Sequence, residues 1–174
     1  MNVDPIRAAI RDVPDFPKPG ILFKDITPIL ADPALFRAAV ELFVNRHRGG
    51  GLDKVAAIDA RGFLFAGALC DRLGIGLVPI RKQGKLPYRT YEESYELEYG
   101  SATLTVHQDA FRPGDRVLLF DDLLATGGTA AASARLIERA GGFVAEIDFL
   151  IELAFLKGRE QLAGRTVFAP IVFQ

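Results

Sequence analysis

The chain has 174 residues, of which 49% are hydrophobic and 25% are charged, and its formal net charge is -1. This composition is typical of a globular protein and excludes an intrinsically disordered chain. The near-neutral charge argues against a nucleic-acid-binding protein, because such proteins normally carry a basic field. The length predicts a single domain with a sizeable hydrophobic core.

Cys70 is the one cysteine, so the chain cannot form an internal disulfide and no cysteine-based zinc site is expected. It lies in an apolar segment, which favours a small buried side chain over a reactive thiol. The sequence shows neither a signal peptide nor an uninterrupted apolar run long enough to span a bilayer. We therefore expect a cytoplasmic protein that makes no contact with membranes.

Two helices and one extended piece are expected in the N-terminal quarter. Each helix starts with an aspartate followed by a proline, a pair that suits a helix cap and the first helical position. The expected elements are a helix from Asp4 that stops before Pro14, a proline-rich loop over 14–20, an extended piece over 21–23 and a helix from Asp32 to about His47.

The remainder alternates short apolar runs with helical patterns. Strands are expected over 54–59, 75–81, 116–122, 143–153 and within 165–174, with helices over 62–73 and 129–142, a long polar loop over 82–94 and a hairpin over 95–107. Strands that alternate with helices predict an α/β fold with a mainly parallel, twisted sheet flanked by helices. In such sheets, ligands bind at the carboxyl ends of the strands. A loop as long as 82–94 inside a compact domain is usually functional.

The stretch DDLLATGGT lies at such a position, after one predicted strand and before one predicted helix. Its glycines and threonines, with the free N–H groups of the helix, predict a cradle for a phosphate. It is neither a P-loop nor a dinucleotide-binding pattern. Asp121 and Asp122 would repel a phosphate, so we expect them to accept hydrogen bonds from sugar hydroxyls or to hold Mg²⁺ through its water molecules.

The apolar strand, the two acids and the Gly-Thr loop together resemble the phosphoribosyl-pyrophosphate motif of the type I phosphoribosyltransferases. Four further segments, FPKPGILFKDITPIL, IDARGFLFAGAL, IRKQGKLP and SYELEYGSATL, occur in the order seen in adenine-specific members of that family. The similarity extends from about residue 16 to 162. It implies a type I phosphoribosyltransferase fold over 1–174, with a small N-terminal hood formed mainly by 14–30 and a flexible catalytic loop.

The resemblance also implies an activity and its partners. Members join adenine to phosphoribosyl pyrophosphate and release AMP and pyrophosphate, with Mg²⁺ as cofactor, and act in purine salvage. The expected assembly is a homodimer, in which some cationic side chains reach a neighbouring subunit's site.

Site residues follow from the matched motifs. The ribose hydroxyls would be held by Asp121 and Asp122, and the 5′-phosphate by Ala125, Thr126, Gly127, Gly128 and Thr129. The leaving pyrophosphate would be held by Asp59, Ala60, Arg61, Arg81, Lys82 and Lys85, with Asp59 orienting Arg61. Catalytic roles fall to Arg61, Glu98 and Tyr99, and adenine would be bound by Leu22, Phe23, Lys24 and Leu153.

Several alternatives stay open at this point. Glu98 is also consistent with the polar face of a strand, and Phe23 with an ordinary core residue. Lys24 stands where the family often has arginine, a change that matters only if its side chain contacts phosphates. His47 and His107 have no evident partner, and we assign neither a catalytic role.

Two other functions are also compatible with the shared ribose-phosphate motif. The first is the same transfer to hypoxanthine, guanine, xanthine or orotate. The second is a regulatory protein that senses phosphoribosyl pyrophosphate without catalysis.

Overall fold

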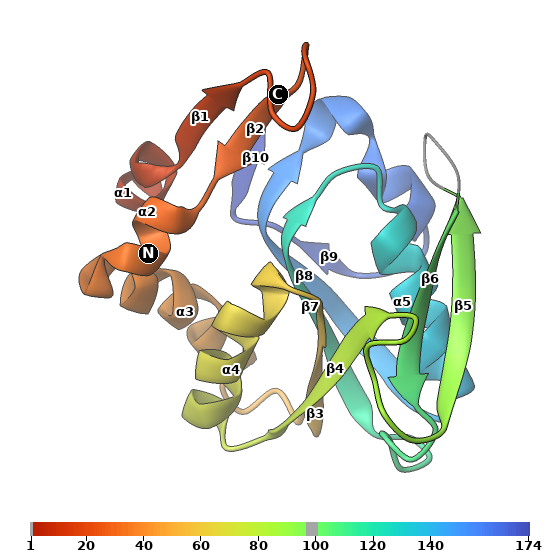
Figure 1. Cartoon of the computed structure of the whole chain (residues 1–174). Coiled ribbons are helices and arrows are strands. Elements are labelled where there is room, and N and C mark those ends of the chain that lie inside the picture. Colours follow the sequence, from red (N-terminus) through yellow and green to blue (C-terminus); the bar gives the residue numbers. More distant parts are fainter. Residues whose placement is uncertain (1, 97–100) are drawn as a thin grey trace. The chain divides into compact units, whose positions relative to one another are not determined.

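The computed structural model describes residues 2–96 and 101–174, and the chain forms two compact units, 1–46 and 47–174. The first unit contains the segment 14–30 that we expect to form a hood, and its hood role stays a prediction. Its elements are α1 (Asp4–Ala9), β1 (Arg11–Pro14), β2 (Leu22–Asp25), α2 (Thr27–Ala31) and α3, which runs from Pro33 to His47 at the start of the second unit (Figure 1).

Both predicted helices of this region are present, and so is the proline-rich loop. Strand β1 and the short helix α2 were not predicted. β1 pairs with β2 in an antiparallel hairpin, with Asp12 opposite Lys24 and Val13 opposite Phe23. The sequence of β1 is short and polar, so it carries no pattern that would predict a strand. The five residues of α2 are too few to show a helical period.

The second unit is built on a single sheet. Its elements are β3 (Lys54–Ile58), α4 (Arg61–Leu73), β4 (Gly76–Lys82), β5 (Thr90–Glu96), β6 (Ser101–His107), β7 (Arg116–Leu124), α5 (Gly128–Arg139), β8 (Phe143–Leu153), η1 (Ala154–Leu156), η2 (Gly158–Leu162), β9 (Val167–Phe168) and β10 (Ile171–Phe173). Within the described residues the sheet has eight strands in the order β10-β8-β7-β3-β4-β6-β5, with β9 beside β8. The pairs among β3, β4, β7, β8, β9 and β10 are parallel, whereas β4 with β6 and β6 with β5 are antiparallel. The predicted α/β fold is therefore confirmed.

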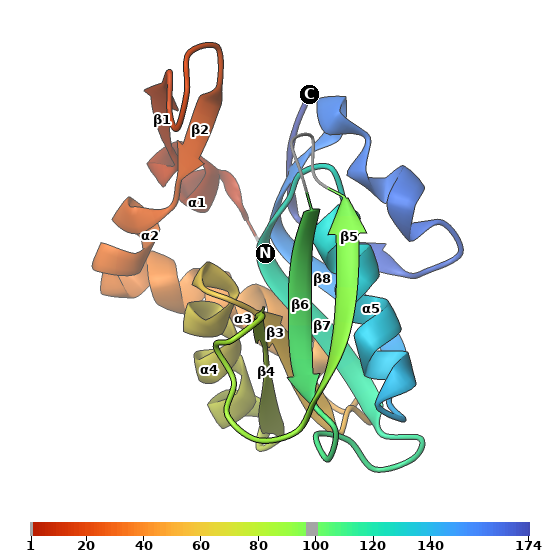
Figure 2. The same ribbon diagram turned by 45° about the vertical axis from the view of Figure 1, so that its right-hand side comes forward.

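Helices α4 and α5 cover opposite faces of this sheet (Figure 2). Neighbouring residues of a strand point to opposite faces, and β7 shows this directly. Phe120 packs against Phe65 of α4, with ring centroids 6.4 Å apart, whereas Leu119 belongs to the cluster that includes Leu136 and Ile137 of α5. Both faces of the central strands are buried, which explains their nearly continuous apolar sequences.

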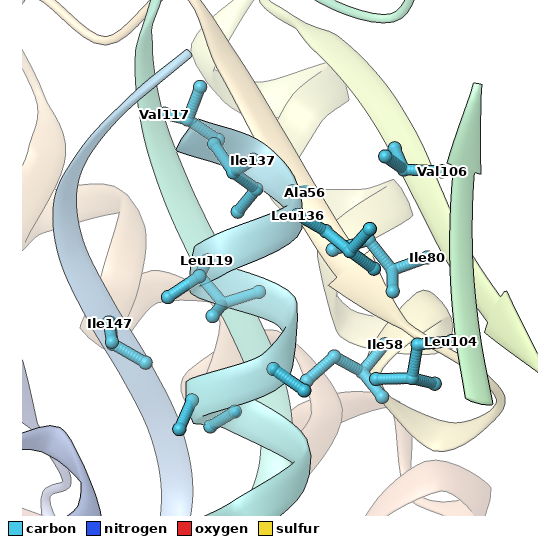
Figure 3. Close-up of a cluster of buried hydrophobic side chains, with 14 of the residues drawn as sticks. Ala56, Ile58, Ile80, Leu104, Val106, Val117, Leu119, Leu136, Ile137 and Ile147 are labelled. Atoms are coloured by element: carbon cyan, nitrogen blue, oxygen red, sulfur yellow. The ribbon is translucent and has the colours of Figure 1, made fainter. Parts of the chain in front are cut away.

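The main hydrophobic core of the second unit lies between the sheet and α5 (Figure 3). Leu136 and Ile137 of the helix belong to one buried cluster with Ile58, Ile80 and Ile147 from three different strands. All five are at most 3% exposed. Burying side chains of this size stabilises a fold by about 1.5–3 kcal/mol each, so this cluster holds the helix against the sheet.

The expected long loop is shorter than predicted, because β5 already begins at Thr90. Its residues pair one to one with β6, from Thr90 opposite His107 to Glu96 opposite Ser101. Only its alternate residues face the core, and charged residues between them gave the segment a loop-like composition. The antiparallel pairing of the predicted hairpin is confirmed, but its first strand begins at Thr90 and not at Tyr95. In the described part of the chain, no helix has the length and hydropathy needed to cross a membrane.

Candidate functional site

The predicted site residues of the second unit lie at the carboxyl edge of the parallel strands. β3 and β7 are neighbours in the sheet; Asp59 follows β3, and Asp121 and Asp122 lie in the last part of β7. Each strand is followed by a helix that begins at this edge, α4 at Arg61 and α5 at Gly128. The free N–H groups of both helix starts therefore surround the acids, in an arrangement suited to bind anions.

Two hollows open at this edge and share Asp121 and Thr129. The larger has a volume of about 240 Å³ and is lined by Ile58, Asp59, Ala60, Arg61, Lys82, Tyr95, Leu104, Asp121, Asp122 and Thr129. The smaller, of about 70 Å³, is lined by Asp121, Leu123, Leu124, Ala125, Thr126, Gly127, Thr129, Ala130 and Phe149. The structure thus brings together most residues predicted for the ribose, the 5′-phosphate and the pyrophosphate.

Asp122 is almost completely buried, at 3% exposed. The Nε atom of Arg61 approaches its Oδ2 atom to 2.9 Å, but the orientation does not make a hydrogen bond, and Oδ2 receives none from the described residues. Burial raises the pKa of Asp122, and the Arg61 charge opposes that rise. A buried carboxylate oxygen without a hydrogen-bond donor is a place where a ligand hydroxyl gains a strong acceptor.

Asp121 is held between its neighbours. Its Oδ1 atom accepts a hydrogen bond from the backbone N–H of Asp122 at 2.9 Å. Burial, followed by the charge of Asp122, raises the pKa of Asp121 well above its ordinary value. Gly62, in the first turn of α4, lies so close that a Cβ atom there would be 2.9 Å from Asp121 Oδ1. A side chain at position 62 would therefore push the helix start away from the carboxylates.

The cations pair differently from the prediction. We expected Asp59 to orient Arg61, but Asp59 Oδ2 accepts a hydrogen bond from Arg81 Nε at 2.9 Å, and Arg61 pairs with Asp122. Arg81 also donates to the carbonyl of Lys85 at 3.1 Å. Of this basic cluster, Lys82 lines the larger hollow, whereas Arg81 and Lys85 are not among its lining residues. The sequence could not decide these pairs, because the partners come from segments far apart in the chain and each guanidinium can satisfy any carboxylate within its reach.

The phosphate loop has the backbone that its glycines suggested. Gly127 has a φ of +85°, in the left-handed region that side chains rarely adopt, and it caps α5. A Cβ atom at Gly127 would also lie closer than 3.0 Å to the carbonyl oxygen of Gly158 in η2. Close packing against a distant segment is therefore a second reason for this glycine, and the sequence did not reveal it.

Tyr95 is a residue of the site that the sequence analysis missed. It lines the larger hollow, and its hydroxyl accepts a hydrogen bond from Thr129 Oγ1 at 3.1 Å. Its ring lies beside Gly128, where a Cβ atom would be 3.4 Å from Tyr95 Cδ2. The signal available in the sequence was its place in SYELEYG, four residues after Tyr91 and on the same face of a strand.

The residues predicted for adenine belong to two different units. Leu22, Phe23 and Lys24 form most of β2, and the Phe23 ring meets Phe16 edge-on with centroids 5.0 Å apart. Lys24 is 8% exposed, and its Nζ atom donates to Asp12 Oδ1 at 2.6 Å. Leu153 ends β8 in the second unit. Their role in binding a base stays a prediction, and Glu98 and Tyr99 lie outside the described residues.

Both histidines have partners, contrary to the expectation. His47 Nε2 is 2.6 Å from Asp148 Oδ2 in a buried contact, and His107 Nε2 lies near the carbonyl of Pro87. His47, Asp148 and Glu146 offer metal-ligating atoms within 4.8 Å of one another. The direct contact of His47 with Asp148 already engages two of these groups, so this cluster is better explained as a buried structural hydrogen bond than as a metal centre.

Comparison with known proteins agrees with this geometry. The phosphoribosyl transferase domain model matches residues 25–159. The adenine phosphoribosyltransferase of Acidothermus cellulolyticus is 57% identical over 93% of this chain and 92% of its own length. The crystal structure of adenine phosphoribosyltransferase from Thermoanaerobacter pseudethanolicus has a TM-score of 0.96 at 50% identity, and covers 99% of this chain and 100% of that one.

A second solved structure is of the Saccharomyces cerevisiae adenine phosphoribosyltransferase, in complex with an imino-altritol bisphosphate and adenine. It is 37% identical, has a TM-score of 0.92, and covers 96% of this chain and 97% of that one. The identities and near-complete coverage, together with the acids and the phosphate loop at the sheet edge, establish that this chain belongs to the adenine phosphoribosyltransferases of the phosphoribosyl transferase family.

Proposed function

We propose that this chain transfers the phosphoribosyl group of phosphoribosyl pyrophosphate to adenine, giving AMP and pyrophosphate in purine salvage. The observation that carries the proposal is the pair of hollows in which adjacent carboxylates, two cations and a phosphate-type loop meet. A sugar with hydroxyls on one side and phosphoryl groups at two ends matches that distribution of charge.

The ribose would be fixed by Asp121 and Asp122. Both carboxylates can accept hydrogen bonds, and Oδ2 of Asp122, which receives none from the described residues, is free to accept one from a hydroxyl. Fixing the ring holds the anomeric carbon still while one bond breaks and another forms. The 5′-phosphate would lie in the smaller hollow, on the N–H groups of residues 125–129 at the start of α5.

The leaving pyrophosphate would lie in the larger hollow. Arg61, Lys82 and the first N–H groups of α4 provide positive charge there. In the reaction, the bond from the anomeric carbon to a pyrophosphate oxygen breaks as a bond to adenine nitrogen forms, and adenine gives up one proton. Cations beside the departing oxygen stabilise the charge that develops on it. We assign Arg61 to this task.

Glu98 and Tyr99 complete the proposed catalytic group. They follow β5 and precede β6, and β5 carries Tyr95 into the larger hollow. We propose that Glu98 contacts the purine nitrogen that changes protonation or the ribosyl centre, and that Tyr99 shields the site. Closure of this loop would exclude water, which otherwise hydrolyses the activated ribose.

Mg²⁺ fits the donor set of the site, since carboxylate oxygens are the ligands it prefers. Asp121 and Asp122 would hold it through its water molecules. When bound, the ion neutralises charge on the pyrophosphate group.

For the base, we propose stacking against Phe23 and Leu153, with backbone groups of Leu22 and Lys24 reading the edge of adenine. The side chain of Lys24 is already paired with Asp12, which supports use of its backbone alone. Backbone donors and acceptors distinguish an amino group from an oxo group, and therefore adenine from hypoxanthine.

We also propose a homodimer that acts in the cytoplasm. Lys85 is exposed and is not among the residues that line the larger hollow of its own chain, which supports a role for this basic segment in a neighbouring subunit's site. Sedimentation at micromolar protein concentration tests the dimer directly: a monomer with full activity would exclude it.

A base panel tests the proposed function. Purified protein, Mg²⁺ and phosphoribosyl pyrophosphate are mixed separately with adenine, hypoxanthine, guanine, xanthine and orotate, and nucleotide formation is followed. We expect AMP from adenine and no product from the other bases. A different accepted base would overturn the assignment of Leu22, Phe23 and Lys24. Binding of phosphoribosyl pyrophosphate with no product from any base would instead indicate a regulatory sensor.

A further inference from the structure

The short helix η2 (Gly158–Leu162) packs directly against the phosphate loop. A Cβ atom at Gly127 would lie closer than 3.0 Å to the Gly158 carbonyl oxygen, and one at Gly158 would lie equally close to the carbonyl oxygen of Ala125. The two backbones therefore touch with no side chain between them. The position of η2 consequently fixes how far the loop can retreat.

η2 supports the loop without entering the ligand's space. Among the described residues, those that line the smaller hollow come from β7, the loop, α5 and β8, and none comes from η2. A change in η2 would therefore act on a bound phosphate only through the loop.

One arginine fastens η2 to the sheet. Arg159 Nε lies 2.9 Å from both carboxylate oxygens of Glu152, and Arg159 Nη2 donates to Glu152 Oε2 at 2.7 Å. Arg159 Nη1 donates to the carbonyl of Val167 in β9 at 3.1 Å. A single guanidinium thus ties η2 to two strands, and its planar fork fixes the orientation as well as the distance.

The anchor point lies beside the loop. Glu152 is 5% exposed and stands in register with Leu124, the last residue of β7 before the phosphate loop. A carboxylate buried to this degree needs a charged partner, because leaving it unpaired is strongly unfavourable. The pair therefore has a defined geometry at the point where the loop starts.

We propose that Arg159 and Glu152 are positioning residues for the 5′-phosphate of phosphoribosyl pyrophosphate. They hold η2 against Gly127, and η2 in turn holds the loop N–H groups in the arrangement that the phosphate requires. This inference rests on the proposed function. Neither residue touches the substrate, so their loss should weaken binding of the phosphorylated ligand and leave adenine binding unchanged.

The test compares Arg159→Met with a matched control, Arg165→Met. Arg165 forms a similar two-point pair with Glu138, at 2.6 and 3.1 Å, but Glu138 lies in the last turn of α5, away from the loop. For Arg159→Met we expect the KM for phosphoribosyl pyrophosphate to rise about 10- to 100-fold, the range expected when a binding group shifts by up to ~1 Å. The KM for adenine should stay within about twofold, and Arg165→Met should change neither KM beyond that.

A second readout does not depend on turnover. Calorimetric binding of ribose 5-phosphate should weaken in Arg159→Met by the same factor as the KM for phosphoribosyl pyrophosphate rises. Arg159→Lys should give an intermediate value in both measurements, because lysine keeps the charge and loses the fork. If Arg159→Met does not fold, the double variant Glu152→Gln with Arg159→Met removes the unpaired buried charge and carries the same expectation.

Two outcomes would overturn the inference. The first is a variant with a lower melting temperature but both KM values and ribose 5-phosphate binding unchanged, which is the signature of a purely structural ion pair. The second is an equal change in Arg165→Met. Failure of the proposed function is recognised separately, because the wild-type protein would then form no AMP.

Discussion

Replacing Gly127 with alanine tests the geometry of the phosphate loop most directly. Its φ of +85° is a conformation that costs an L-residue about 1–2 kcal/mol. The new Cβ atom would also meet the Gly158 carbonyl oxygen and, at 3.0 Å, the Cβ atom of Gln161. The first contact is with backbone, which cannot rotate away, and overpacking of this kind costs about 1–3 kcal/mol.

The two terms together predict a loss of roughly 2–5 kcal/mol in the free energy of unfolding. For a protein of this size the melting temperature should fall by about 4–20 °C. If the loop moves to relieve the contact, part of this loss will appear instead as a higher KM for phosphoribosyl pyrophosphate. The assay is therefore a thermal melt together with a titration of this substrate at saturating adenine, both on the same preparation.

Gly128→Ala is the matched control for stability. Gly128 lies in the first turn of α5 without a positive φ, and its nearest neighbour would be Tyr95 Cδ2 at 3.4 Å, an ordinary contact. Alanine favours helix over glycine by up to about 1 kcal/mol, so the melting temperature should be unchanged or slightly higher. The reasoning would be refuted if Gly127→Ala kept both the wild-type melting temperature and the wild-type KM.

Three further predictions concern other groups. The double variant Asp121→Asn with Asp122→Asn should lose nearly all activity. At neutral pH its free energy of unfolding should be about 0.5–2 kcal/mol higher than that of the wild type, and its melting temperature should rise accordingly. A lower melting temperature would contradict the raised pKa values of the two aspartates. Because those pKa values are raised in the folded state, the free energy of unfolding of the wild type should fall as the pH rises above the ordinary aspartate pKa. The double variant lacks both carboxyl groups, so its free energy of unfolding should depend less on pH over the same range. Burial raises the pKa of the Cys70 thiol to about 11, so Ellman's reagent at pH 8 should react slowly with native protein and rapidly in denaturant; rapid native reaction would show that the thiol is accessible. Lys24→Met should leave the KM for adenine within about twofold, since the side chain pairs with Asp12, an exposed partner of little energetic weight; a large rise would mean that the side chain contacts a ligand.

The phosphate loop is predictable from the sequence, whereas the residues that support it are not. DDLLATGGT was identified from residue types alone, since two acids before a Gly-Thr loop have a chemical meaning wherever they occur. Gly158 and Glu152 carry no such meaning in the sequence. They matter because chain folding places them behind that loop, although Gly158 lies 31 residues and Glu152 lies 25 residues after Gly127 in the chain. Tyr95 likewise has no recognisable role in the sequence, because its hydroxyl becomes part of the site only when β5 packs beside α5.

The partners of the charged side chains also could not be predicted from the sequence. The sequence predicted a cluster of cations and acids at one sheet edge, and the structure confirms that Arg61, Lys82, Asp59 and both acids of β7 meet there. It gave the wrong partner for Asp59, since any of several guanidinium groups within reach satisfies a carboxylate equally well. Likewise, the sequence pattern predicts a loop up to Ser94 where the structure has strand β5, because the polar residues of that strand outnumber the alternate residues that pack inward.

Local physical chemistry in the sequence therefore determined the α/β class, the order of most helices and strands, and the loop that suits a phosphate. These depend on hydrophobic period, on helix caps and on glycines, which act over a few residues. Tertiary structure alone decided which acid pairs with which base, which backbone supports the loop, and which carboxylate oxygen is buried without a hydrogen-bond donor. Those properties depend on contacts between segments far apart in the chain, and on the removal of water from them, which no local pattern records.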